Sequence, residues 1–388
     1  MVVKKTVARL LRQPEGSFFL FGPRGTGKST WLRATFQGAH YIDLLDERRY
    51  RGYLGNAGLF ADELRALAPG WIVVVDEIQR LPALLNEVHR GIEERGLRFA
   101  LSGSSARKLK QSGTNLLAGR AVRRFLHPFV PEEIAAAFDL EAALRYGTLP
   151  IIWSAADPAD ALRAYTDMYL KEEIQAEALV RNLPGFARFL PIAALFHGQT
   201  INVSSLARDA GVARTTVEGY LGVIEDTLLA FRLPAFSAKL RVRERAHPKL
   251  YFTDAGVARA LRGRTGSLSD DERGPLIEGL VASVLRAYRD YRGLFDEWFY
   301  WAPTESARTE VDFLLRRGDA LVAIEVKAAA AWSDRLSRGL RAVARMPGLV
   351  RRVLVHLGKE RYRSEDGIDA LPLADFFREV ETGALWGS

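Results

Sequence analysis

The chain has 388 residues, 48% hydrophobic and 26% charged, a balance typical of soluble globular proteins that argues against disorder. This length exceeds what one hydrophobic core usually organises, so we expect two or three domains. The formal net charge of +8 favours an anionic partner, although an arginine-rich composition alone gives the same excess. The absence of cysteine excludes disulfides, thiolate catalysis and cysteine-ligated zinc.

The hydropathy of the chain gives no sign of a membrane segment. No apolar run approaches the roughly 20 residues that a membrane-spanning helix requires. Residues 1–12 are basic and contain no long apolar stretch of the kind found in secretory signals. We therefore expect a cytoplasmic protein without membrane contact.

The first predicted elements are a short buried strand over residues 17–21 and a helix that follows at Thr30. Between them lies Gly22-Pro23-Arg24-Gly25-Thr26-Gly27-Lys28-Ser29, which fits the phosphate-binding pattern G-x-x-x-x-G-K-[ST]. Its glycines let backbone N–H groups turn toward phosphates, and the positive end of the helix adds to the attraction. We expect residues Gly22 to Thr30 to bind ATP, with Lys28 reaching the β and γ phosphates and Ser29 ligating Mg²⁺.

Two adjacent acids follow the next strong strand signal. Residues 71–75 form a β-branched run that ends at Asp76 and Glu77. Unpaired buried carboxylates are costly, so packing alone does not explain them. We expect Asp76 to hold magnesium, directly or through water, and Glu77 to polarise the attacking water. With the phosphate-binding loop, these acids predict a P-loop ATPase.

The rest of the first domain offers weaker candidates. Strands are predicted over residues 41–44 and 98–101, and the second ends at Ser102 and Ser104, either of which could sense the γ-phosphate or simply form a turn. Arg120 could act as a catalytic arginine finger, from a neighbouring subunit of a homo-oligomer, or form a surface salt bridge. The alternation of strands and helices predicts a parallel sheet covered on both faces, within a domain of residues 1–138.

Residues 139–262 are predicted to form a helical linker and a winged helix. The linker has a packed helical face at Tyr165, Tyr169, Ile174 and Leu179. A helix over 204–210, a turn at Gly211, a helix over 215–229 and a strand over 250–252 indicate the winged helix. The second of these helices carries Glu218, Glu225 and Asp226, which DNA phosphates would repel, so a packing or linking role is favoured over groove insertion.

Residues 268–388, after a linker over 262–267, are predicted to fold as helix, three strands, helix and strand. Glu278 lies on the first helix, Asp312 on a strand, and Glu325 and Lys327 share one face of the next strand. Carboxylates beside a lysine can hold magnesium and orient a water against a phosphodiester. This is the PD-(D/E)XK nuclease arrangement, with Val311 in place of the usual proline. A fold that no longer cuts, with its acids paired to Lys327, is the alternative.

Taken together, these stretches resemble those of prokaryotic AAA-like proteins usually described only as ATP-binding proteins. The matching stretches are Gly22–Thr30, Asp76–Gln79, Ser102–Ser105, Leu117–Arg120, Tyr146–Pro150, Lys249–Gly256, Glu310–Phe313 and Ile324–Lys327. The resemblance implies an ATPase core, a linking winged helix and a C-terminal restriction-endonuclease-like α/β domain of unknown function. It implies no substrate.

Three functions remain in competition at this point. The favoured one is magnesium-dependent ATP hydrolysis coupled to DNA binding or remodelling, with a nuclease-like domain whose cleavage activity is left open. A slow nucleotide-dependent switch that acts through protein partners is the second. An ATP-binding scaffold without DNA contact is the third. Stimulation of ATP turnover by DNA would separate the first from the others.

Overall fold

The computed structural model describes residues 7–105, 117, 119–168, 180, 182–236, 247–303, 309–330 and 333–387. They belong to two compact units. The N-terminal unit comprises Met1–Phe129, Leu149–Ile151 and Asp226–Leu229, and the C-terminal unit comprises Val130–Thr148, Ile152–Glu225 and Ala230–Ser388. The segments predicted as the second and third domains thus lie mainly in one compact unit.

The N-terminal unit is built on a five-stranded sheet with the order β2-β3-β4-β1-β5, in which every neighbouring pair is parallel. This confirms the predicted parallel α/β sheet. Its strands are β1 (Ser17–Phe21), β2 (His40–Asp43), β3 (Ile72–Asp76), β4 (Arg98–Gly103) and β5 (Ala121–Phe125). Its helices are α1 (Lys28–Thr35), α2 (Glu47–Gly55), α3 (Gly58–Arg65) and α4 (Leu85–Arg95).

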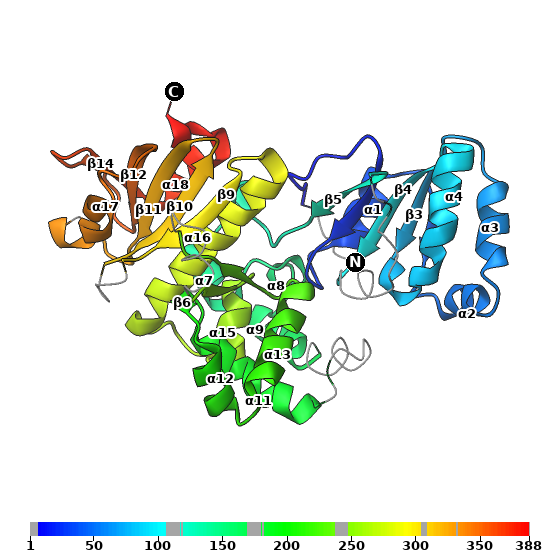
Figure 1. Ribbon diagram of the computed structural model, residues 1–388, viewed down its shortest axis with the longest axis horizontal. Coiled ribbons are helices and arrows are strands. Elements are labelled where there is room, and N and C mark those ends of the chain that lie inside the picture. The colour runs from blue at the N-terminus through cyan, green and yellow to red at the C-terminus, as the bar shows by residue number, and fades with distance from the viewer. Residues whose placement is uncertain are drawn as a thin grey trace. The chain divides into compact units, whose positions relative to one another are not determined.

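The alternating side chains of β1 show why both faces of this sheet are covered. All five residues of β1 are buried. Phe18 meets Trp31 of α1 edge to face, with ring centroids 6.2 Å apart. Phe19 and Phe21 instead join an apolar cluster that includes residues of α3 and α4. Figure 1 shows these two helices next to each other in the same unit. A strand buried on both sides reads as a continuous apolar run, as Ser17–Phe21 does.

The first half of the C-terminal unit is largely helical. Its helices are α6 (Pro131–Ile134), α7 (Leu140–Tyr146), α8 (Pro150–Trp153, which begins in the N-terminal unit), α9 (Pro158–Met168), α11 (Leu183–Leu195), α12 (Val203–Ala210), α13 (Arg214–Asp226) and α15 (Ala255–Leu261). Tyr165 is buried on α9, whereas the other three residues of the predicted packed face lie outside the described residues.

A helix–turn–helix and a small sheet occupy the middle of this unit. The Asn202 side chain caps α12 by accepting from the Ser204 amide at 2.9 Å, and Gly211 ends the helix with φ 64°. α13 ends at Asp226, three residues earlier than predicted, and Leu228 has a positive φ of 59°. The antiparallel strands β6 (Gln199–Thr200), β8 (Lys249–Phe252) and β7 (Ala230–Leu233) follow in that spatial order.

The last part of the chain forms a six-stranded mixed sheet with the order β13-β14-β12-β11-β10-β9. Its elements are α16 (Asp270–Arg292), β9 (Glu297–Trp301), β10 (Val311–Arg317), β11 (Ala320–Val326), α17 (Arg338–Ala342), β12 (Leu349–His356), β13 (Tyr362–Arg363), β14 (Ile368–Pro372) and α18 (Leu373–Thr382). The helix predicted over residues 333–345 is instead a 3₁₀ turn followed by the short α17. None of the helices described here is both long enough and apolar enough to cross a bilayer.

Candidate functional site

The loop between β1 and α1 has the backbone shape expected of a phosphate cradle. Gly25 and Gly27 have φ of 82° and 85°, a region that glycine enters without steric cost. Gly22 is equally required, because a Cβ there would lie 2.4 Å from the Leu126 carbonyl oxygen. The loop therefore depends on glycine at each of these three positions.

Lys28 is folded into this loop. Its ammonium donates to the carbonyl oxygens of Gly22 at 2.8 Å and Pro23 at 3.3 Å, and its side chain is buried. These acceptors belong to the loop itself, so bound phosphate oxygens could replace them while the ammonium stays in the cradle. Ser29 follows Lys28 in the first turn of α1. Both residues fit ATP with magnesium.

Arg9 braces the loop from the segment before β1. Its guanidinium donates to the Thr26 carbonyl at 2.8 Å and the His127 carbonyl at 2.5 Å, and lies over the Phe129 ring. The Ile151 amide donates to the Gly25 carbonyl at 3.1 Å. Sequence reasoning missed both contacts, because nothing in the pattern around these residues marks them as partners of a loop so distant in sequence.

Asp76 ends β3 as a buried carboxylate held by two hydroxyl groups. The Tyr41 phenol donates to Oδ2 at 2.5 Å, and the Ser102 hydroxyl donates to Oδ1. Burial, together with the Asp76 carboxylate, raises the pKa of Tyr41 well above its ordinary value, so the phenol stays protonated and remains a donor. Asp76 is 1% exposed, and these two donors explain how it tolerates burial.

Glu77 adopts a strained backbone conformation directly after β3. Its φ of 60° and ψ of 44° lie in the left-handed region, which costs free energy for a residue other than glycine. The Glu77 amide donates to the Ser102 hydroxyl at 3.2 Å, and the Gln79 amide group donates to the Glu77 carboxylate and to Ser104. Ser102 thus contacts both acids, whereas Ser104 is linked to Glu77 through Gln79, a residue that sequence reasoning gave no role.

Arg120 lies in the turn before β5 and pairs through its Nε with the Glu93 carboxylate of α4. Both side chains are exposed. This is the surface salt bridge that the sequence offered as the alternative to an arginine finger.

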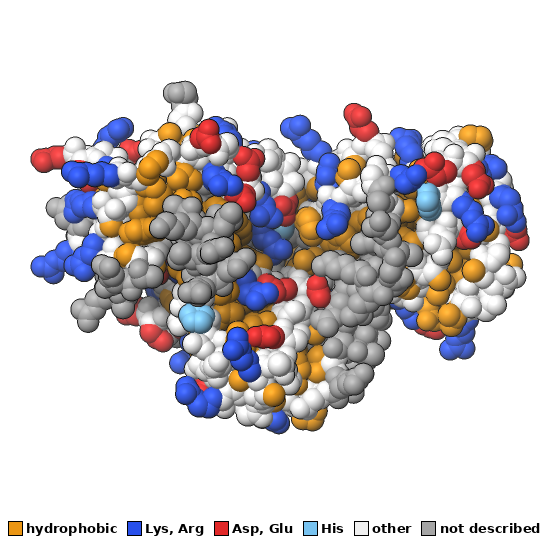
Figure 2. Space-filling view, viewed as in Figure 1, with side chains coloured by type: hydrophobic (Ala, Val, Ile, Leu, Met, Phe, Trp, Pro, Cys, Tyr) orange, Lys and Arg blue, Asp and Glu red, His pale blue; other side chains and the backbone are white. Residues whose placement is uncertain are grey.

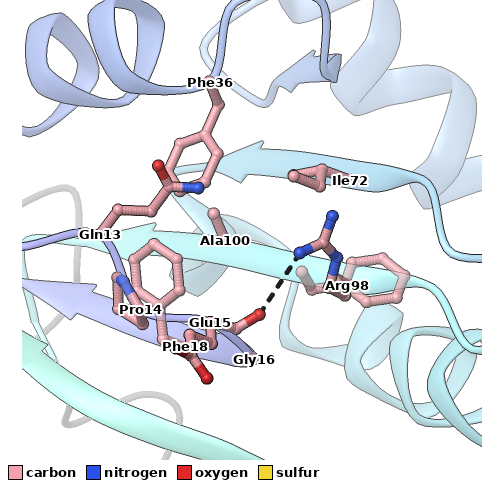
Figure 3. A pocket seen from close by; sticks show the side chains of 10 residues that line it. Gln13, Pro14, Glu15, Gly16, Phe18, Phe36, Ile72, Arg98 and Ala100 are labelled. Atoms are coloured by element: carbon pink, nitrogen blue, oxygen red, sulfur yellow. Dashed lines mark hydrogen bonds between the residues drawn. The ribbon is translucent and has the colours of Figure 1, made fainter.

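A shallow hollow in the same unit lies away from the phosphate-binding loop. It is lined by residues at the start of β1 and β4, including Gly16, Phe18 and Arg98, and by Phe36 after α1 (Figure 3). Arg98 donates to the Glu15 carbonyl across it at 3.5 Å. Ligands of parallel α/β sheets bind at the carboxyl ends of the strands, so this hollow at the amino ends is not the nucleotide site.

The C-terminal carboxylates gather around a lysine that was not part of the predicted set. Lys249 projects from β8, and its side chain is 2% exposed. Its ammonium lies 2.9 Å from Glu278 Oε1, 3.2 Å from Asp312 Oδ1 and 3.3 Å from Glu310 Oε1. The Tyr251 hydroxyl also donates to Glu278, at 2.5 Å. Lys249 is the first residue of the stretch that carries part of the family resemblance, which was the only signal in the sequence.

The backbone of the sheet sets the direction of Asp312. The pairing of β10 with β9 slips between Val311 and Leu314, which leaves one extra residue on β10. Asp312 Oδ2 accepts from the Val326 amide of β11 at 2.9 Å, and its other oxygen faces Lys249. Both oxygens of Asp312 are therefore engaged.

Glu325 and Lys327 pair with each other at 2.9 Å, as their shared strand face predicted. The second oxygen of Glu325 is buried and has no hydrogen-bond partner. Burial raises the pKa of Glu325 to about 7, and burial beside Asp312 raises that of Glu278 to about 7. Within the described residues, no group of three or more acidic or histidine side chains is arranged to hold a metal ion. The predicted magnesium set of Glu278, Asp312 and Glu325 is thus engaged by ammonium groups, because Lys249 enters it from another sheet.

Three parts of the chain match known families. Residues 15–135 match the family described as AAA domain, and residues 137–268 and 273–376 match two domains of unknown function, DUF8612 and DUF4143. Together with its parallel sheet, the first match defines the N-terminal part as an AAA-like ATPase domain. The other two matches assign no activity to the remainder.

Two uncharacterized mycobacterial proteins, Rv2008c of Mycobacterium tuberculosis and Mb2031c of Mycobacterium bovis, are each 28% identical over 365 residues, or 91% of this chain and 79% of theirs. Among solved structures, Aeropyrum pernix Orc1 in complex with DNA is 14% identical with a TM-score of 0.25, over 65% of this chain and 87% of that one. The replication initiator DnaA bound to AMPPCP and single-stranded DNA is 13% identical with a TM-score of 0.26, over 55% and 83%. These structural scores are too low to carry an argument about function.

Proposed function

We propose that the N-terminal unit binds ATP with Mg²⁺ and hydrolyses it. The observation that carries this proposal is the convergence at one sheet edge of the glycine cradle, the Lys28 ammonium and the acids that end β3. Lys28 would turn from the loop carbonyls to the terminal phosphates, and Ser29 and Asp76 would hold Mg²⁺. Bound magnesium would neutralise charge that develops on the phosphates.

Glu77 would orient and polarise the attacking water, and its backbone strain supports this role. Strained residues persist where the surroundings over-determine them, and they cluster at functional sites. Ser102 bonds the Asp76 carboxylate and the Glu77 amide together, so it would fix the spacing between the metal-binding acid and the base. In this scheme Ser102 is a positioning residue.

The test measures ATP binding and turnover in Lys28→Ala, Glu77→Gln and Glu94→Gln, the last an exposed acid of the same unit that serves as a control. Lys28→Ala should lose tight ATP binding. Glu77→Gln should bind ATP but turn over at least about 100-fold more slowly, because general-base catalysis contributes that much. Wild-type turnover in Glu77→Gln would refute the assignment of the base.

We further propose that ATP turnover is coupled to DNA, through contacts that do not read sequence. The support is the net charge of +8 and the nuclease-like centre of the C-terminal unit. Figure 2 shows basic side chains scattered among acidic ones rather than gathered in one patch on the visible face. On α13, Glu218 pairs with Arg214 and Glu225 with Arg232, which favours a packing role for this proposed winged helix.

Turnover with and without single-stranded, duplex and branched DNA tests this coupling. We expect stimulation by at least one form and binding that weakens steeply as salt rises, because phosphate contacts release counterions. If none of the three forms of DNA changes the rate of ATP turnover, and no salt-sensitive DNA binding is found, the nucleotide switch that acts through protein partners is favoured instead.

For the C-terminal domain we propose a PD-(D/E)XK nuclease-like fold that does not cleave in this arrangement. Asp312 and Glu325 would be the principal metal ligands of such a nuclease, with Glu278 as a third and Lys327 beside the hydroxide or phosphate. The ammonium groups at these carboxylates support an inactive centre. Plasmid, linear and branched DNA should remain intact with Mg²⁺ or Mn²⁺, with or without ATP. Nicking that vanishes in Asp312→Asn and Lys327→Ala would overturn this.

A further inference from the structure

The position of Lys249 is unusual for a charged side chain. It belongs to β8 of the three-stranded sheet, yet its ammonium ends among carboxylates supplied by α16 and by the segment around the start of β10. Burial alone would lower the pKa of Lys249, but its neighbours, Glu278 first among them, outweigh burial and hold the pKa well above its ordinary value. The group is therefore a buried cation.

Three carboxylates contact this ammonium, although with Lys249 in place no group of three acids among the described residues is arranged to hold a metal ion. Three carboxylate oxygens from Glu278, Asp312 and Glu310 lie 2.9, 3.2 and 3.3 Å from it. Hard divalent cations also take carboxylate oxygens, at shorter distances of roughly 2.0–2.6 Å. One cluster of acids can hold either kind of cation, but the same oxygens cannot serve both at once.

From this geometry we propose that Lys249 is the resident cation of the C-terminal centre and occupies the place of a divalent metal ion. The intact centre then takes up no metal, and replacing Lys249 with a neutral side chain of similar length converts the acids into a metal site. This inference rests on the proposed nuclease-like centre and is independent of ATP hydrolysis.

Other groups at the centre agree with this assignment. Lys327 forms its close ion pair with Glu325, whereas Lys249 is the ammonium in direct contact with Glu278. The charges of Asp312 and Glu278 also act on Lys327 and help to raise its pKa, so Lys249 is the contacting cation of a centre that holds two. Glu325 is not among the carboxylates that Lys249 contacts, so the proposed site comprises Glu278, Asp312 and Glu310.

Terbium luminescence sensitised by tyrosine gives a local readout, because Tyr251 contacts Glu278 and the Tyr300 ring centre lies 5.8 Å from the Lys249 ammonium. Without nucleotide, Lys249→Met should show saturable Tb³⁺ luminescence that Mn²⁺ competes away. Wild type and Lys359→Met, which removes an exposed lysine, should lack it. Adding Asp312→Asn to Lys249→Met should abolish the signal.

Thermal unfolding covers the case in which Lys249→Met folds poorly. Removing one partner of a buried ion pair leaves uncompensated charge, so this variant should be destabilised. Mn²⁺ should raise the Tm of Lys249→Met in proportion to the logarithm of the Mn²⁺ concentration and leave the Tm of wild type unchanged, since a ligand stabilises only the state that binds it.

Asp312-dependent Tb³⁺ binding by wild type would overturn the proposal. So would a folded Lys249→Met without Tb³⁺ binding, or an unfolded one that Mn²⁺ does not rescue. ATP hydrolysis is not involved in any of these outcomes.

Discussion

In each unit, one polar side chain forms a hydrogen bond that stabilises a buried polar or charged group. Ser102 does so in the nucleotide site by donating to Asp76 and accepting from the Glu77 amide. His197 does so in the C-terminal unit, where its Nδ1 accepts from the Phe252 amide of β8 at 3.0 Å. Ser102 meets Asp76 because β4 pairs with β3, and His197 meets Phe252 because residue 197 forms a backbone bridge with β8.

Ser102→Ala should lower ATP turnover about tenfold or more while changing ATP affinity little, because it removes the group that spaces Asp76 from Glu77 and leaves the Asp76 carboxylate with one donor fewer. Ser104→Ala is the matched control, since Ser104 contacts only Gln79 among these residues. Steady-state turnover and nucleotide titration measure the two effects. Equal losses in both variants would refute the distinct role of Ser102.

His197 should make stability depend on pH. Burial, with a smaller contribution from Arg262, lowers the pKa of His197 from 6.5 to about 3, so the folded state holds it neutral while the unfolded state takes up a proton. The stability it contributes is complete above pH 6.5 and is lost as the pH falls toward 3. Compared with His197→Asn, wild type should lose about 1 kcal/mol more for each pH unit between 6.5 and 5. Denaturant unfolding at several pH values measures this; parallel profiles would contradict it.

At the scale of elements, α16 is the helix that joins the two sheets of the C-terminal unit. It contacts β8 and β11, and carries Glu278 between them (Figure 1). It starts at residue 270, because Ser269 and Glu272 form a capping box there. A buried pair of Arg259 with Glu272, 3.2 Å apart, fixes that first turn against α15.

Gly279 allows α16 to approach His197. A Cβ at this position would lie 1.9 Å from His197 Nε2, so Gly279→Ala should destabilise the protein by roughly 1–3 kcal/mol through overpacking. Gly219→Ala in α13 meets nothing within 4 Å and should be neutral or stabilise by up to about 1 kcal/mol. Chemical denaturation compares the two. A Gly279→Ala variant as stable as Gly219→Ala would show that the ring can move aside.

At the scale of the whole molecule, the question is whether one chain completes the ATPase site. In this chain the Arg120 guanidinium forms a salt bridge with Glu93. A surface salt bridge of this kind contributes little stability. Breaking it so that Arg120 can contact a phosphate on a neighbouring subunit would therefore cost little free energy. An arginine finger acting between subunits remains our hypothesis for Arg120.

Arg120→Ala should therefore lower hydrolysis and leave ATP affinity nearly intact, as loss of a charge that acts on the transition state does. Mixing it with Lys28→Ala should restore part of the turnover, because each variant supplies the half-site that the other lacks. Glu93→Ala is the control, since it breaks the surface pair and keeps the arginine. If a stable oligomer shows no restoration, Arg120 acts within its own chain or is structural.

Local signals were strong enough to predict most of the first domain from the sequence. The glycine spacing of residues 22–29, the β-branched run before Asp76 and the alternation of strands and helices predicted the parallel sheet and the loop that the structure contains. Each of these depends on neighbours along the chain, through backbone conformation or strand burial. The shared face of Glu325 and Lys327 followed from strand alternation in the same way.

The contacts between segments were decided only by the tertiary structure. Tyr41 and Ser102 reach Asp76 across strands, Arg9 braces a loop beyond β1, and Lys249 enters a cluster of acids built on other elements. No local pattern marks these residues, because a buried charge is stabilised by whichever partners the fold brings near it, regardless of their distance in sequence. The sequence by itself therefore determined the elements and the types of chemical group, while packing determined which cation the C-terminal carboxylates hold.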